Sequence, residues 1–185
     1  MNNVHWVHLR NFWPTDDDGN TSYSVLLDEV KPHLTQGSVK LGGNVYKEGR
    51  LTAMFSKTNA VMKYSGRTLA PIAPKKGGYL DILLDLFNEG EFRDLLMSEV
   101  PHLRGILPKF NAVFINWYRP PSETEGNMDG LGAHSDDTTG MTSDIIVSIT
   151  LCEPGGERLF AMHDKAQGEK VVWQAELADG DIVIM

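Results

Sequence analysis

An imidazole and a carboxylate stand two residues apart in the segment Gly132-Ala133-His134-Ser135-Asp136-Asp137. The region is rich in β-prone residues, and the period of two along a strand turns both side chains to one side. His134 and Asp136 could therefore bind one metal ion. With a second His from elsewhere in the chain, the pair would form the facial triad that holds non-haem Fe(II). A surface His beside two acids in a glycine-rich turn is the plainer interpretation of the same residues.

Short apolar and β-branched segments surround this pair. They are separated by Gly, Pro and Asp turns and cover 112–119, 145–151, 158–165, 171–177 and 181–185. Several short strands with such turns predict an antiparallel sandwich or barrel. Three shorter β-prone pieces precede them at Asn44–Tyr46, Leu51–Ser56 and Val61–Tyr64.

Helical patterns lie nearer the start of the sequence. Thr21 and Ser22 could cap a helix that runs to about His33. Between Tyr79 and Val100 the apolar residues follow a helical period that is interrupted near Asn88-Glu89-Gly90. Because helices come first and strands second, we expect an α+β architecture with helices packed outside a β core.

The composition indicates one globular domain over residues 1–185. The chain is 41% hydrophobic and 23% charged, without a repeat or a long linker. Its single cysteine, Cys152, excludes an internal disulfide and a Cys-based zinc site, which favours a reducing compartment. With no long apolar run and no signal peptide, we expect an intracellular protein, cytoplasmic or nuclear, without a membrane partner and monomeric.

The charge distribution is uneven. The net charge is −8, which argues against a protein coated in basic surface for nucleic acid. Residues 39–76, however, contain a single acid, Glu48, and eight basic residues: Lys40, Lys47, Arg50, Lys57, Lys63, Arg67, Lys75 and Lys76. This basic window could face a polyanion. A solvated sheet edge protected by lysines explains the same charges.

The order of several motifs resembles the AlkB-like family of Fe(II)- and 2-oxoglutarate-dependent dioxygenases. Asn116-Trp117-Tyr118-Arg119 is followed by a polar loop, by His134-Ser135-Asp136-Asp137, and by apolar strands that end in Asp179-Gly180-Asp181. Earlier, Arg50-Leu51-Thr52-Ala53-Met54-Phe55 and Tyr64-Ser65-Gly66 resemble the nucleotide lid of that family. The resemblance covers about residues 20–185 and lies in the ordered set of motifs.

The resemblance implies a double-stranded β-helix, or jelly roll, over about 112–185, with a nucleotide-lid region over about 44–76. It also implies oxidative demethylation of N-alkylated bases in DNA or RNA, with Fe(II), 2-oxoglutarate and O₂. By position, His134 and Asp136 match iron ligands, and Asn116 and Tyr118 match residues that contact 2-oxoglutarate. The residues expected at the substrate are Tyr64, Ser65, Arg67, Asp137 and Thr138. At Thr138 the family often carries an acid, so base recognition is open.

The family pattern extends beyond this sequence. Its second His ligand follows the Gly-Asp strand by about a dozen residues, and its 2-oxoglutarate-binding arginines come later, whereas this sequence ends at Met185. We therefore expect a chain truncated at its C-terminus, with the strand 181–185 lacking a sheet partner. Two alternatives remain: a catalytically incompetent nucleic-acid-binding or interaction module, and a cupin-like metal site that uses His163. We expect His5 and His8 at the surface and His102 in a loop or helix end.

Overall fold

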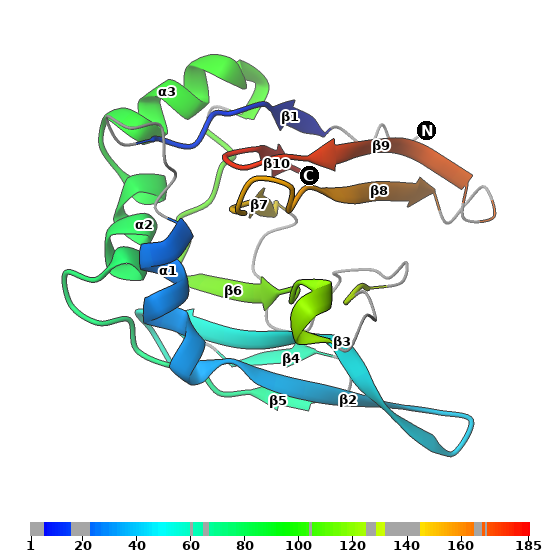
Figure 1. The fold of residues 1–185 in the computed structure, drawn as a ribbon. Coiled ribbons are helices and arrows are strands. Elements are labelled where there is room, and N and C mark those ends of the chain that lie inside the picture. The colour runs from blue at the N-terminus through cyan, green and yellow to red at the C-terminus, as the bar shows by residue number, and fades with distance from the viewer. Residues whose placement is uncertain are drawn as a thin grey trace. The chain divides into compact units, whose positions relative to one another are not determined.

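The computed structural model describes residues 6–15, 23–59, 61–64, 67–103, 105–124, 129–131, 145–164, 168 and 170–185. Over these residues the protein is mixed α+β, with few helices and several small antiparallel sheets (Figure 1). The chain forms two compact units, one made of residues 1–24 and 145–185 and the other of residues 25–144.

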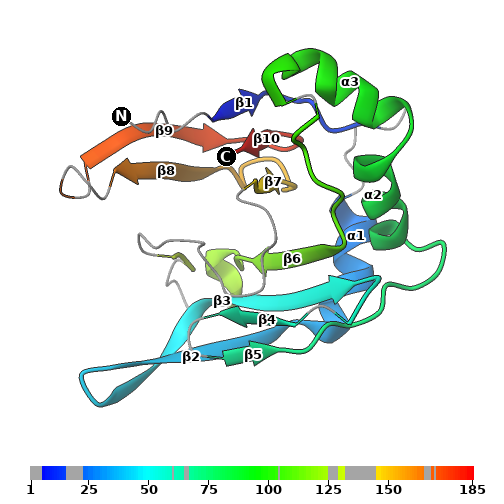
Figure 2. The same ribbon diagram turned by 180° about the vertical axis from the view of Figure 1, so that it is seen from behind.

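A three-stranded antiparallel sheet is the frame of the 25–144 unit. Its strands are β2 (Thr35–Leu41), β3 (Asn44–Ser56) and β6 (Ala112–Trp117), with β3 in the centre (Figure 2). Gly42 and Gly43, both at positive φ, make the tight turn from β2 to β3. The two pieces expected at 44–46 and 51–56 form one strand, because β2 pairs with both, with a register shift between Gln36 and Ser38, and β6 pairs with the second. Strand β2 is absent from the sequence prediction.

The helices follow the predicted positions closely. Helix α1 covers Tyr23–Val30, and a 3₁₀ turn, η1, continues it over Lys31–His33. The chain leaves the α-helical form there because Pro32 has no backbone N–H to donate. The predicted break is confirmed, since α2 ends at Asn88 (Tyr79–Asn88) and α3 begins at Glu91 (Glu91–Glu99). Gly90, at a φ of 86°, separates the two helices.

The core of this unit lies between the sheet and its helices. Val30 of α1, Ala53 and Phe55 of β3, and Leu80 of α2 form a buried cluster. Partly buried apolar side chains surround the cluster: Leu26, Leu27, Leu34, Ile72, Val113 and Ile115. One face of the sheet is therefore packed by burial of apolar side chains against α1 and α2.

Smaller elements complete the 25–144 unit. Strands β4 (Met62–Tyr64) and β5 (Arg67–Leu69) form a two-stranded antiparallel sheet. Past the end of β2, the backbone of Ile72 extends the main sheet, since its N–H donates to Met54 O and its carbonyl accepts from Ser56 N–H. Two further 3₁₀ turns are η2 (Pro101–Leu103) and η3 (Pro121–Glu123).

The other unit contains a three-stranded antiparallel sheet with β10 (Ile182–Ile184) in its centre. Strand β10 pairs with β1 (Val7–Leu9) along one edge and with β7 (Val147–Ile149) along the other (Figure 1). Ile182, Val183 and Ile184 are buried, as expected for a central strand. The expectation that this last strand lacks a partner is therefore wrong, because residues 7–9 supply a ladder from the far end of the sequence.

A hairpin of β8 (Arg158–Asp164) and β9 (Lys170–Leu177) also belongs to this unit. Trp173 of β9 gathers aromatic side chains around it. The ring of His8 meets it edge-on at 5.4 Å between centroids, and Phe160 and Trp6 lie at 6.1 and 6.4 Å. The edge-on contact of His8 with Trp173 is one of the arrangements that aromatic rings prefer.

Candidate functional site

The two faces of the β3–β6 ladder have different chemistry. Because side chains alternate along a strand, Ala53 and Phe55 face the helices, whereas Arg50 and Thr52 belong to the opposite face. A cation–π contact confirms this division, since the Arg50 guanidinium carbon lies 5.9 Å from the centre of the Phe114 ring. We call the side that carries Arg50, Thr52, Met54, Phe114 and Asn116 the polar face, after its Arg, Thr and Asn side chains.

Asn116 belongs to the polar face through its register. It lies directly opposite Thr52 in the ladder, and residues opposite each other in an antiparallel pair share one face. The Asn116 side chain is exposed, so a ligand can reach its amide. Tyr118, the second residue predicted to contact 2-oxoglutarate, follows the end of β6 and is half-buried. The structure thus adds Thr52 to the neighbourhood of a predicted site residue.

The side chains that β3 contributes to the polar face are buried. The side chains of Glu48, Arg50 and Thr52 are 7%, 2% and 1% exposed. Arg50 Nε lies 3.9 Å from Glu48 Oε2, so the two opposite charges lie close together away from water. The sequence carries a signal for this row, because charged or hydroxyl side chains recur every second residue from Glu48 to Thr52, on the side opposite Leu51 and Ala53.

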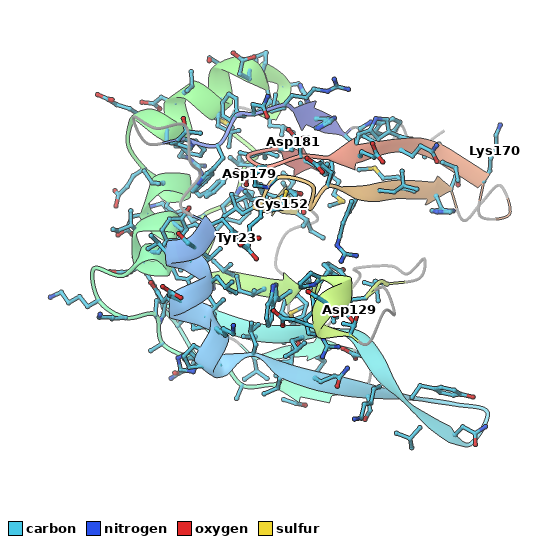
Figure 3. All side chains as sticks on the ribbon, in the orientation of Figure 1. Tyr23, Asp129, Cys152, Lys170, Asp179 and Asp181 are labelled. Carbon is cyan, nitrogen blue, oxygen red and sulfur yellow. The ribbon has the colours of Figure 1, made fainter. Side chains whose placement is uncertain are left out.

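An ion pair anchors the chain that leads away from β6. Arg119 donates to the Asp129 carboxylate through Nε at 2.9 Å, Nη2 at 3.1 Å and its backbone N–H at 3.0 Å. Asp129, which follows η3 in the sequence and is labelled in Figure 3, is buried. Such a bidentate carboxylate pair is stronger than a neutral hydrogen bond, and it raises the pKa of Arg119 further above its ordinary value.

A close backbone contact lies beside this ion pair. Gly130 forms an isolated antiparallel bridge with Gly49 of β3. A Cβ atom on Gly49 would lie only 2.7 Å from the carbonyl oxygen of Gly130, so residue 49 has to be glycine for the two chains to approach this closely. Residues 129–131 are therefore held against β3 at the level of Glu48 and Arg50. Sequence reasoning treated 120–130 only as a loop.

Several predicted site residues lie outside the residues that the structure describes. They are the predicted iron ligands His134 and Asp136, and the predicted substrate contacts Ser65, Asp137 and Thr138. Of the other two predicted lid residues, Tyr64 ends β4 and Arg67 begins β5, and they are partners in that ladder. Within the described ranges no three His, Cys, Asp or Glu side chains come together as a group that could hold a metal ion.

The basic window is less available to a polyanion than its composition indicates. Arg50 is buried beside Glu48. Lys57 Nζ lies 2.7 Å from Asp81 Oδ1 and 2.6 Å from Asp85 Oδ1 of α2. These contacts raise the pKa of Lys57, and the same contact with Lys57 lowers the pKa of Asp81. Exposed positive charge remains on Lys47, Lys63, Lys75 and Lys76.

His8 is not the free surface residue that the sequence suggested. Its Nε2 lies 3.0 Å from Asp181 Oδ2, and its side chain is only 12% exposed. Asp181, which directly precedes β10 and is labelled in Figure 3, also accepts hydrogen bonds from the backbone N–H groups of Asn11 and Ala178. Burial alone would raise the pKa of this carboxyl, but the hydrogen bonds from Asn11, His8 and Ala178 outweigh burial and lower it.

This lowered pKa predicts acid sensitivity. A carboxyl whose folded pKa lies below its unfolded value of about 3.9 stabilises the fold above that value, and the contribution is lost as the pH falls through the folded pKa. We expect Asp181→Asn to melt below wild type at pH 6 and the gap between the two melting temperatures to narrow toward pH 3. Thermal unfolding followed by circular dichroism at several pH values measures this difference in melting temperature. A gap that stays constant with pH would contradict this role for Asp181.

The remaining candidate groups do not form a site together. His163 is an exposed residue of β8, and His102 is exposed in η2. Burial, followed by the nearby Asp179 carboxylate, raises the pKa of the Cys152 thiol to about 11, so this thiol is protonated at neutral pH and a poor nucleophile. The backbone N–H of Cys152 donates to Asp179 (Figure 3).

A hollow of about 660 Å³ opens on the helix side of the 25–144 unit. His33, Phe55, Ile72 and Ile82 contribute to its lining. Glu29 at its edge has a structural task, because its carboxylate accepts the backbone N–H groups of Tyr79 and Leu80 at the start of α2. The hollow contains none of the predicted site residues.

No protein-family model matches the sequence, and a search of curated proteins finds no match either. Among the helices of the described part of the chain, none is long and apolar enough to cross a membrane.

Proposed function

We propose that the chain is an AlkB-like dioxygenase core that oxidatively demethylates N-alkylated bases of DNA or RNA. The observation that carries the proposal is the order of the motif Asn116-x-Tyr118, the anchored residues 129–131, and the pair His134-x-Asp136. In this proposal, the antiparallel strands from residue 112 onward belong to a double-stranded β-helix.

The polar face fits a 2-oxo acid in its chemistry. It offers the exposed Asn116 amide beside the Thr52 hydroxyl, which lies within the β3–β6 ladder and has no hydrogen-bond partner among the described residues. Asn116 and Tyr118 would bind 2-oxoglutarate, and His134 and Asp136 would hold Fe(II). Bound there, Fe(II) and 2-oxoglutarate would supply the oxidation: 2-oxoglutarate would lose CO₂ and take up one oxygen atom of O₂ to become succinate, and the other oxygen atom would hydroxylate the methyl group, which then leaves as formaldehyde.

The chain's own residues have separate tasks in this proposal. The buried β3–β6 ladder holds Asn116 at a fixed position, since its neighbours on the other face pack against α1 and α2. The ion pair between Arg119 and Asp129 fixes the residues that precede His134 in the sequence. The exposed lysines 47, 63, 75 and 76 would attract the phosphate backbone without selecting a base.

The test is the release of succinate from 2-oxoglutarate with Fe(II) and O₂, with and without a methylated oligonucleotide. We expect the oligonucleotide to stimulate succinate release by the wild-type chain. His134→Ala should reduce succinate release by more than about 100-fold, because losing a metal ligand costs more activity than losing a residue that only hydrogen-bonds to a ligand. His102→Ala is the matched control, since it removes an exposed imidazole of η2.

Folded wild-type protein that releases no succinate would contradict the enzymatic proposal for this chain. Tight oligonucleotide binding by the same sample, weakening as salt is raised, would then favour the nucleic-acid-binding module instead. Equal activity in the wild type and His134→Ala would remove His134 from the metal site.

A further inference from the structure

The hydroxyl of Thr52 is buried, and no hydrogen bond within the described part of the chain accounts for it. Its side chain is 1% exposed, and Oγ1 has no hydrogen-bond partner within the described part of the chain. Buried polar side chains nearly always have a partner, and one left without it destabilises the fold. Valine has almost the same shape and favours β-strands at least as strongly, so packing gives no reason for a hydroxyl here.

The neighbours of Thr52 on the polar face are partly polar. Directly across the ladder lies Asn116, whose side chain is exposed, and two residues after Thr52 lies the buried Met54. Two residues before Thr52 on the same strand lies the buried Arg50 guanidinium. The other face of the strand is closed, because Ala53 and Phe55 pack in the helix-covered core. A partner for the hydroxyl can therefore come only from the polar face.

We propose that the hydroxyl of Thr52 donates a hydrogen bond to a carboxylate of the 2-oxo acid co-substrate, beside the amide of Asn116. This inference rests on the proposed function. It adds a residue of β3 to a site whose two predicted co-substrate contacts, Asn116 and Tyr118, lie in β6 and just after it. A hydroxyl donor next to an amide can satisfy two lone pairs of one carboxylate. The nearby Arg50 is partly balanced by Glu48, so its charge favours an anion only modestly.

The experiment measures 2-oxoglutarate binding by calorimetry in the presence of Mn²⁺, together with the melting temperature of each ligand-free protein. Thr52→Val should weaken binding on the order of tenfold or more, as expected for a lost hydrogen bond to a charged group. Its melting temperature should equal or exceed that of wild type, because the unpaired hydroxyl is removed. Thr52→Ser retains the donor and should bind within about threefold of wild type. Thr68→Val, an exposed threonine of β5, is the control.

The possible outcomes separate the two proposals. Wild-type binding that Thr52→Val leaves unchanged would overturn this inference, while the proposed function would stand. A Thr52→Val protein that both binds weakly and melts at a lower temperature would identify a structural hydroxyl, and this result would also overturn the inference. Wild-type protein that does not bind 2-oxoglutarate at all would overturn the proposed function as well.

Discussion

Replacing Phe55 with alanine is expected to lower the free energy of unfolding of the 25–144 unit by about 3–5 kcal/mol. Phe55 is 2% exposed and belongs to the buried cluster with Val30 and Leu80. The rings of Phe55 and His33 also make an edge-on contact, with 5.6 Å between their centroids. Truncation would remove the Phe55 contacts with both α1 and α2. It would also leave a cavity, because β3 is paired on both sides and cannot shift to fill the space.

Urea unfolding followed by circular dichroism measures this loss. Val45→Ala is the matched control, because Val45 belongs to the same strand but is 62% exposed, and we expect a change within about 0.5 kcal/mol. Phe55→Leu should destabilise less than Phe55→Ala. A loss below about 1 kcal/mol for Phe55→Ala would mean that sheet and helices are not joined by a packed core.

Replacing Asp129 with asparagine is expected to cost about 2–3 kcal/mol of stability. The change removes the negative charge that accepts two hydrogen bonds from the partly buried Arg119 guanidinium and one from its backbone N–H. Because the Arg119 side chain is 21% exposed, the loss should fall below that of a fully buried pair. The same substitution should loosen the bridge between Gly130 and Gly49.

A double-mutant cycle separates the ion pair from other effects of the substitution. Arg119→Met and the double variant complete the cycle, and we expect a coupling energy above about 1 kcal/mol from urea unfolding. Methionine retains much of the apolar stem, so packing changes little. Strictly additive losses would show that the two side chains do not stabilise each other.

The sequence predicted local structure better than pairing. The apolar period from Leu80 to Leu96 and its interruption near Gly90 correspond to α2 and α3, because both depend on neighbours in the chain. The pairing of β1 with β10 joins residues 7–9 to residues 182–184. No local pattern encodes which distant strand supplies a ladder, and the three residues of β1 are too few to show a period.

The candidate site divides in the same way. A motif predicts Asn116 and Tyr118 as co-substrate contacts, and the structure gives Asn116 its place on the polar face. Arg50 was counted among exposed basic residues, but its exposure depends on the sheet face that it occupies, and that requires knowing that residues 44–56 form one strand. The burial of Thr52 and the ion pair of Asp129 were missed because both depend on partners from other segments.

The alternation of Leu51–Ser56, the part of β3 that pairs with β6 without a register shift, also limits how the gene for this chain can change in length. One codon inserted between those of Leu51 and Ser56 would exchange the two faces of the strand beyond the insertion. Polar side chains would then enter the helix-covered core, and Phe55 would leave it. The Gly42–Gly43 turn has open space around both glycines. Insertions and deletions in this region should therefore accumulate at that turn and be purged from the strand.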